Sequence, residues 1–283
     1  MEYKIPHPMS LKEALSKLFP DSSRSKLKNW LEMGRFSIDG KRAEKENQIL
    51  DEGMVLSAID RFVAPKVPGL TLLYEDRHLV VIDKPSGLLS VPLDDEKNSH
   101  RHALGLLKKH LHTDQIFAVH RIDREASGVL IFAKGKESEE RLKKLFELHD
   151  LKRQYLAIVE GKLLENEGTW KEKLLELPNY DVVVSPEGKE AITHFKVIRR
   201  SPKYSFLQVT LETGRKHQIR VHCQRKGFPI LGDFRYGALE NPLGRLALHA
   251  ELLELVHPFT KKPLSFKSPI PRAFRMLGVG LKH

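Results

Sequence analysis

The chain has one cysteine and no long apolar run, and each of these shortages excludes a class of protein. With Cys223 alone, no intrachain disulfide can form and no cysteine-rich zinc site can be built. No apolar stretch approaches the ~20 residues that are needed to cross a bilayer. The N-terminal residues lack a basic patch followed by an apolar run, so they do not read as a signal peptide. We therefore expect a cytoplasmic protein with no membrane partner.

Positive charge is what the chain has in excess. Its 283 residues carry a formal net charge of +11, with 40% hydrophobic and 30% charged residues. This composition is typical of a globular protein rather than a disordered one. A basic surface of this size favours a polyanionic partner, because each phosphate that is neutralised releases condensed counterions. From charge alone, a merely basic protein without a nucleic-acid partner is the alternative.

Two prolines and a glycine between residues 64 and 69 interrupt the pattern and indicate a domain boundary. We predict an N-terminal domain over residues 1–63, a linker over 64–70 and a second domain over 71–283. In the first domain, Ser10 precedes Glu13 at the spacing of a helix capping box. A second helix is expected over 23–33, and short strands are expected over 35–38 and 55–59.

The second domain is rich in strand-like segments. Helices are expected over 102–110, 137–148 and 215–226. Because strands dominate and helices intervene irregularly, we predict an α+β fold with a mixed, mainly antiparallel sheet, preceded by a small α/β domain. The strands are expected over residues 79–83, 128–133, 153–159, 191–198, 205–211 and 246–255.

Several cations gather on the second predicted helix and on the turns that follow it. Such a face can bind phosphates, although an ordinary solvated helix face is the alternative. With residues 34–41 and 51–55, this segment resembles the small RNA-binding domain named after ribosomal protein S4. The resemblance implies RNA docking with no chemistry of its own. The predicted RNA-binding residues are Arg24, Lys26, Lys28, Arg35 and Lys41.

A single carboxylate between two arginines stands out in residues 120–134. Asp123 lies just before a predicted buried strand, with Arg121 and Arg124 on either side. A sheet fixes the position of a side chain at the mouth of a strand, which suits chemistry. By itself, an aspartate between arginines is more often a structural ion pair.

A second stretch, residues 211–222, changes that balance. It indicates a strand, a glycine turn and a helix on which His217 and Arg220 share a face. The glycine, arginine and aromatic residues of segment 227–237 are typical of an RNA-contacting rim. A helix that covers the sheet and exposes a basic side is the alternative.

Together these stretches resemble the RluA-type pseudouridine synthases. The resemblance implies that Asp123 is the catalytic aspartate and that Arg220 pairs with it. It further implies that Tyr155 stacks on the target base and takes part in proton handling. The other matching segments follow the family's order within residues 70–270, at 73–76, 83–88, 152–155, 246–250 and 257–260.

The resemblance also implies residues that contact the substrate. Arg121 matches the residue that fills the space left by the flipped base, and Leu248 matches an apolar residue of the pocket. We add His217 as a packing or RNA-contact residue rather than an acid–base group. One position departs from the family's usual pattern, because Ala126 stands where a threonine is common. No proposed chemical step uses that hydroxyl.

The implied reaction breaks the N1–C1′ bond of uridine, rotates the base, re-bonds it through C5 and releases the C5 proton. The uridine must first leave its stack, and stacking and hydrogen bonds in a pocket offset that cost. A guanidinium beside Asp123 stabilises its charged form and transfers no proton itself. The sequence leaves open whether Asp123 attacks the sugar or removes a sugar proton. Because the reaction is an isomerisation, we expect no cofactor and no metal.

Two rival functions lie in other classes. One is a non-catalytic RNA-binding or ribosome-assembly protein, which would have no chemical need for Asp123, Tyr155 and Arg220 together. The other is a hydrolase acting on RNA, which would normally need a second catalytic carboxylate or a metal. Within the synthases, the N-terminal domain favours large-subunit ribosomal RNA over transfer RNA by family analogy. We expect the protein to act as a monomer.

Overall fold

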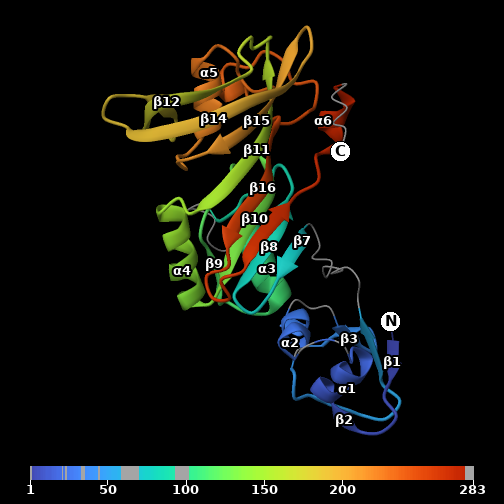
Figure 1. The fold of residues 1–283 in the computed structure, drawn as a ribbon. Helices are drawn as coiled ribbons and strands as arrows, with labels where there is room; N and C mark the ends of the chain where they lie inside the picture. Colours follow the sequence, from blue (N-terminus) through green and yellow to red (C-terminus); the bar gives the residue numbers. More distant parts are fainter. Residues whose placement is uncertain are drawn as a thin grey trace.

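The computed structural model describes residues 2–20, 22, 24–32, 36–43, 45–58, 70–92 and 102–277. Within them, the chain forms an N-terminal unit with a 4-stranded and a 2-stranded sheet, and a larger unit built on an 11-stranded sheet. Figure 1 shows the N-terminal unit in blue and the larger unit in cyan to red. Of the predicted linker, only Leu70 lies among the described residues.

The N-terminal unit is built on two short helices and a strand order of β1-β6-β3-β4. The predicted helix cap at Ser10 is confirmed, because the amide of Glu13 donates to Ser10 Oγ at 3.2 Å. Leucines of both helices pack against the sheet. The elements are β1 (Glu2–Lys4), β2 (Met9–Ser10), α1 (Leu11–Leu18), α2 (Arg24–Glu32), β3 (Phe36–Ile38), β4 (Lys41–Arg42), β5 (Ile49–Leu50) and β6 (Val55–Ala58).

The larger unit alternates strands with a few helices. Its elements are β7 (Thr71–Glu75), β8 (Leu79–Lys84), α3 (Ala103–Leu111), β9 (Ile116–Ala118), β10 (Ser127–Lys134), α4 (Lys136–Glu147), β11 (Leu151–Glu160), β12 (Glu167–Glu176), β13 (Val182–Val184), β14 (Lys189–Arg200), β15 (Tyr204–Leu211), α5 (Gln218–Arg225), the 3-10 helix η2 (Phe234–Tyr236), β16 (Leu248–Val256), β17 (Pro263–Lys267) and α6 (Arg272–Met276).

The large sheet has the order β13-β12-β14-β15-β11-β16-β10-β8-β7, with β17 paired to β16 and β9 to β10. Its pairs are antiparallel except that β10 and β16 run parallel, which confirms the predicted mixed, mainly antiparallel sheet. Figure 1 shows β11 and β16 running through the middle, α5 over the upper strands, and α3 and α4 beside the lower ones.

A glycine makes the parallel pair possible. Gly128 has φ +115°, and a Cβ at this position would lie 2.1 Å from the carbonyl oxygen of Ala250 on β16. Only glycine allows both this conformation and this approach of the two backbones. The start of β10 is thereby fixed against β16, and so is the loop that precedes it.

The sequence predictions differ from the structure in two respects. The helix predicted over 215–226 begins only at Gln218, because His217 has the left-handed φ of 52° and ends the preceding turn. The other difference is that nine strands were not predicted. They are short, or they alternate charged and apolar residues at the exposed part of the sheet, as in β12. These strands are β1, β2, β4 and β5 in the N-terminal unit and β7, β9, β12, β13 and β17 in the larger unit.

Candidate active site

Asp123 lies on the connection between β9 and β10, and the segment after β8 holds this connection in place. Ser90 Oγ donates to the carbonyl of Ile122 at 2.8 Å and accepts from its amide at 3.2 Å. The amide of Gly87 donates to the carbonyl of Arg124 at 2.8 Å. The backbone around Asp123 is therefore fixed from both sides by hydrogen bonds to one neighbouring loop.

A buried lysine completes this support. Lys84, at the end of β8, is 0% exposed, and its ammonium donates to the carbonyls of Pro85, Leu88 and Arg124 at 3.0, 2.6 and 3.0 Å. Burial lowers the pKa of Lys84 to about 7, while the charges of Asp123 and other nearby acids act in the opposite direction. Lys84 thus ties the loop after β8 to the loop that carries Asp123.

Arg220 comes from α5, whose start is pinned to β14 by Gln218. The side-chain amide of Gln218 donates to Ile192 O and Thr193 Oγ1, both at 2.9 Å. Its oxygen accepts from the amide of Arg215 at 2.9 Å. Because these bonds fix the first turn, the side chain of Arg220 enters the site from a set direction.

Arg220 joins two carboxylates. Its Nη1 donates to Asp123 Oδ2 at 3.2 Å, while Nε and Nη2 donate to the two oxygens of Asp233 at 2.8 and 2.7 Å. The side chain of Arg220 is 6% exposed and that of Asp233 is 1% exposed. Burial acts to lower the pKa of Arg220, but the bonds and charges of Asp233 and Asp123 outweigh it and keep the guanidinium charged. The bidentate pair with Asp233 leaves one edge of Arg220 for Asp123.

Tyr236 covers the guanidinium. The Cζ of Arg220 lies 4.9 Å from the centre of the Tyr236 ring, a favourable cation–π distance. The Tyr236 hydroxyl lies 2.7 Å from His217 Nδ1 and accepts from the amide of Val182 at 3.3 Å. Burial, helped by nearby cations including Arg220, lowers the pKa of His217 to about 4. His217 is therefore neutral near pH 7 and orients Tyr236.

Tyr155 lies on β11, where it pairs with Val209 of β15 and Ala250 of β16. Burial raises the pKa of Tyr155 to about 12, and the charges of Arg153 and Asp123 act on it in opposite directions. Arg220 is hydrogen-bonded to Asp123 and the charge of Asp123 acts on Tyr155, so side chains from three separate segments of the sequence lie in one region.

Comparison with known proteins shows which family the chain matches. Residues 78–225 match the family described as RNA pseudouridylate synthase, and residues 9–56 match the S4 domain. The chain belongs to the RNA pseudouridylate synthase family. It is an isomerase that acts on RNA, and an S4 RNA-binding domain precedes its catalytic part.

Individual relatives agree with this assignment. A ribosomal large subunit pseudouridine synthase D of Xanthomonas campestris is 33% identical over 291 residues, covering 95% of this chain and 88% of the relative. An uncharacterized RNA pseudouridine synthase of Bacillus subtilis is 36% identical over 223 residues, covering 76% of this chain and 73% of the relative. The structure of human RNA pseudouridylate synthase domain containing 4 superposes with a TM-score of 0.59 at 26% identity, covering 72% and 90% of the two chains.

The predicted substrate-contact residues occupy different environments. Arg121 is exposed and makes no hydrogen bond or ion pair within the described residues. Leu248 is 4% exposed and packs in the same core cluster as Ala126. Ala126 lacks the hydroxyl of the usual threonine, but the turn from Asp123 to Ala126 still forms. The amide of Ala126 donates to the carbonyl of Asp123 at 3.2 Å.

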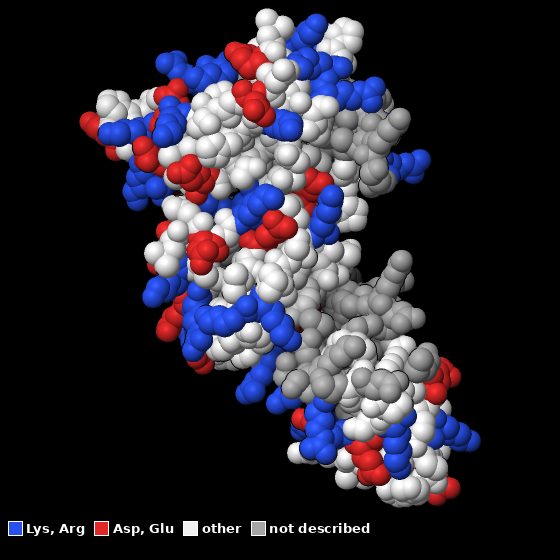
Figure 2. Space-filling view, viewed as in Figure 1, with Lys and Arg blue, Asp and Glu red and all other residues white. Residues whose placement is uncertain are grey.

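Only part of the predicted RNA-binding set can be placed. Arg24 and Lys28 are exposed on α2, while Leu27 and Leu31 of the same helix are buried. Arg35 and the side chains of Lys26 and Lys41 lie outside the described residues. In Figure 2, lysines and arginines lie over both units, with acidic residues between them. The face seen there has no large area of one sign.

Sequence reasoning missed three residues of the site, namely Lys84, Asp233 and Tyr236. Segment 227–237 was interpreted as an RNA-contacting rim, but Asp233 is 1% and Tyr236 8% exposed, and both face Arg220. The sequence does show an aspartate and a tyrosine among the glycines of this segment. The segment is too short for a hydrophobic pattern to indicate which side chains are buried. Nothing in the sequence showed that they faced inward.

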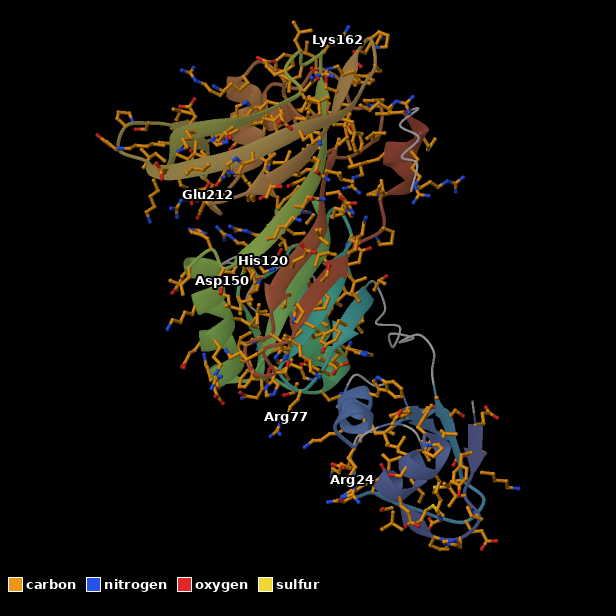
Figure 3. The ribbon with its side chains drawn as sticks, viewed as in Figure 1. Arg24, Arg77, His120, Asp150, Lys162 and Glu212 are labelled. Atoms are coloured by element: carbon orange, nitrogen blue, oxygen red, sulfur yellow. The ribbon has the colours of Figure 1, made fainter. Side chains whose placement is uncertain are left out.

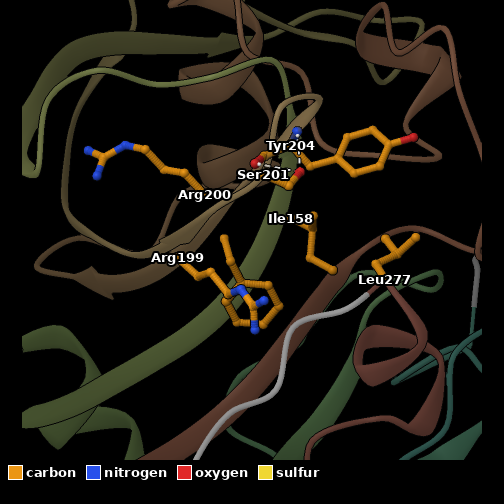
Figure 4. Close-up of a pocket in the computed structure, with 7 residues that line it drawn as sticks. Ile158, Arg199, Arg200, Ser201, Tyr204 and Leu277 are labelled. Carbon is orange, nitrogen blue, oxygen red and sulfur yellow. Dashed lines mark hydrogen bonds between the residues drawn. The ribbon is translucent and has the colours of Figure 1, made fainter.

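The described residues offer neither a metal site nor a membrane-spanning helix. Among the described residues, no group of three or more histidine, cysteine or acidic side chains could hold a metal, and none of the helices is long and apolar enough to span a membrane. A cavity of about 130 Å³ lies between β11, the β14–β15 turn and α6. Figure 4 shows its lining, which includes none of the predicted site residues.

Proposed function

We propose that the protein isomerises specific uridines to pseudouridine in large-subunit ribosomal RNA. Relatives named for that activity align with 95% of the chain, a span that includes the S4 segment as well as the catalytic part. An enzyme of assembling ribosomes works where ribosomes are made, so we also propose that it is cytoplasmic. We infer that it acts as a monomer.

The contact between Asp123 and Arg220 carries the chemical part of the proposal. Asp123 is the reacting carboxylate, and Arg220 holds one of its oxygens at 3.2 Å. In one route, Asp123 bonds to C1′ as the N1–C1′ bond breaks and later leaves as C5 bonds to C1′. In the other, Asp123 takes a sugar proton and returns it. Both routes need the ionised carboxylate, and in both the C5 proton is lost and N1 gains one.

Tyr155 supplies the face on which the uracil stacks. With a pKa of about 12, its hydroxyl stays protonated near neutral pH. Tyr155 therefore enters the reaction as a neutral phenol that offers a ring face and an O–H donor. Stacking of this kind offsets the loss of base stacking in the RNA.

The remaining site residues serve the extrusion of the uridine. We assign the exposed side chain of Arg121 to the space that the flipped base leaves, because no hydrogen bond or ion pair within the described residues holds it in place. Leu248 forms part of the apolar wall, and His217 supports Tyr236 beneath Arg220. Residues 1–63 dock the RNA, residues 71–283 carry the chemistry, and 64–70 link them.

Mapping of pseudouridines tests the proposal. Ribosomal and transfer RNA from cells with and without the gene are labelled with carbodiimide and read by primer extension. We expect one or more large-subunit ribosomal positions to lose the label when the gene is deleted and to regain it with wild-type protein. Loss confined to transfer RNA would replace the ribosomal assignment. A change in RNA mass on incubation with pure enzyme would contradict an isomerisation.

A further inference from the structure

Arg153 is a buried cation next to the site that the proposed chemistry does not use. It lies on β11 and is 9% exposed. Within the described residues the only hydrogen bond of its side chain runs from Nη2 to the carbonyl of Glu212 at 3.3 Å, and its Cζ lies 5.9 Å from the ring centre of Phe146. The Nε is buried without a partner. Most of the guanidinium's donors are therefore unused.

The acids near Arg153 are committed elsewhere. Glu212 gives Arg153 its main-chain carbonyl, whereas its carboxylate lies 3.0 Å from His194. Glu251 accepts from Gln154 at 3.1 Å, on the opposite side of β11. Within the described residues no carboxylate pairs with Arg153, and burial lowers the pKa of its guanidinium. A buried charge without a counter-ion is costly for the free protein.

The fold keeps space for this cation. A Cβ at Gly214 would lie 2.3 Å from Arg153 Nη1, so any other residue there would displace the guanidinium. On the other side, the neutral ring of His120 stacks on Phe146 at 4.5 Å. Figure 3 labels His120 and Glu212 in the region where β11 begins. The groups around Arg153 that these contacts identify are thus uncharged and do not neutralise the guanidinium.

Arg153 lies on the same face of β11 as Tyr155. Arg153 pairs with Leu211 and Tyr155 pairs with Val209 in an unbroken register with β15. Residues two apart on a strand point to the same face, roughly 7 Å apart. The charges of both Arg153 and Asp123 act on Tyr155. A nucleotide whose base stacks on Tyr155 therefore has Arg153 within reach of its backbone.

We propose that Arg153 binds a phosphate of the RNA backbone beside the flipped uridine, an inference that rests on the proposed function. Phosphates are the anions that a uridine-containing strand offers, and a guanidinium binds two phosphate oxygens through parallel N–H donors. The charge that is unpaired in the free enzyme becomes paired when RNA binds. Arg153 thereby couples binding of the strand to placement of the base over Tyr155.

The first test compares Arg153→Met with Lys152→Met. Lys152 is the neighbouring residue on the opposite face, half exposed and 3.2 Å from Glu254, so the two variants lose the same charge from the same strand. We expect Arg153→Met to bind the target RNA roughly 10- to 100-fold more weakly. The slope of log affinity against log salt should fall by about 0.7–0.9. Lys152→Met should stay close to wild type in both.

Thermal unfolding of the free proteins separates binding from structure. Because Arg153→Met removes a buried unpaired cation, its melting temperature should equal or exceed that of wild type. A purely structural arginine would instead lower the melting temperature, and that result would overturn the inference. Arg153→Lys keeps the charge but loses the planar guanidinium, so it should bind the RNA with an affinity between those of wild type and Arg153→Met. This variant provides the test if Arg153→Met does not fold.

The second test neutralises single phosphates. A short RNA around the mapped uridine is made with a methylphosphonate on its 5′ or its 3′ side. One of these linkages should weaken binding by wild type and not weaken Arg153→Met further, because both changes remove the same contact. If each methylphosphonate weakened binding by Arg153→Met as much as it weakens binding by wild type, Arg153 would not bind a flanking phosphate.

Failure of the inference and failure of the proposed function give different results. If wild type isomerises the RNA while Arg153→Met binds and melts as Lys152→Met does, only the role of Arg153 falls. If wild type modifies no ribosomal uridine, the ribosomal assignment falls. The melting comparison needs no RNA and still tests whether Arg153 is an unpaired charge.

Discussion

The S4 unit and the catalytic centre hold their positive charges in opposite ways. Arg24 and Lys28 stand exposed on α2, where water and salt screen them. Arg220 is 6% exposed, is bound by Asp123 and Asp233 and is covered by Tyr236. Surface cations act by their number and can be replaced by one another. A buried cation acts by its orientation, so single changes there should have far larger effects.

The largest effect is expected at Asp123, the carboxylate that we propose to react. Asp123→Asn keeps the shape but cannot attack the sugar or accept a proton as a carboxylate does. We expect the single-turnover rate to fall at least about a thousandfold. The rate is followed by release of tritium from C5 of labelled uridine, and RNA affinity in filter binding should change little. Wild-type turnover in this variant would refute the role of Asp123.

Asp233→Asn tests whether orientation matters as much as charge. The amide would present N–H groups to Arg220 in place of one accepting oxygen, so the guanidinium should turn away from Asp123. We expect the rate at saturating RNA to fall roughly 10- to 100-fold with RNA affinity unchanged. Loss of the buried partner should also lower the free energy of unfolding by roughly 3 kcal/mol.

A matched control makes this comparison sharp. Asp181→Asn makes the same chemical change in an exposed pair, where Asp181 lies 2.6 Å from Arg235. Exposed pairs contribute little, so activity should stay near the wild-type value. Equal losses in Asp181→Asn and Asp233→Asn would contradict the distinction between buried and exposed cations.

Acid should lower the free energy of unfolding of the larger unit, because this unit contains buried histidines. Burial lowers the pKa of His222 and His249 to about 4, from an ordinary value of 6.5. Below pH 6.5 the unfolded chain takes up protons that the folded state refuses, so stability falls as pH drops from 6.5 towards 4. Each histidine contributes at most about 1.4 kcal/mol per pH unit. The N-terminal unit has only the exposed His7.

Urea unfolding between about pH 7 and about pH 5 measures this loss. His222→Gln should reduce the pH dependence of the unfolding free energy of the larger unit. Glutamine takes up no proton when the chain unfolds, whereas histidine does. An unchanged slope in that variant would show that other groups cause the acid sensitivity.

The smallest effect is expected on α2. Replacing Arg24 and Lys28 together by glutamine should weaken RNA binding roughly threefold to tenfold and reduce the salt slope by up to about 2. The rate at saturating RNA should not change, because neither residue lies in the catalytic centre. Binding is measured by filter retention at several salt concentrations. A loss of rate at saturating RNA would mean that the S4 unit does more than dock the substrate.

Local patterns in the sequence predicted the regular elements well where burial was uniform. The strand around residues 128–133 is a continuous apolar run, and the cap of α1 needs only Ser10 and Glu13. Prediction failed for β12, whose charged residues alternate with apolar ones on an exposed part of the sheet. It also extended α5 too far, because the left-handed backbone at His217 leaves no mark in the pattern.

By itself, the sequence determined the class of protein and the order of its segments, because residue type and order along the chain are enough to identify a family. It also led to the proposal that Asp123, Tyr155 and Arg220 form the active site. Only the tertiary structure decided that Asp233 orients Arg220, that Lys84 ties two loops together and that Arg153 lies buried without a counter-ion. Each of these depends on which side chains meet across distant strands. Burial and ion pairing depend on which distant segments pack together in the fold, so no local sequence pattern reveals them.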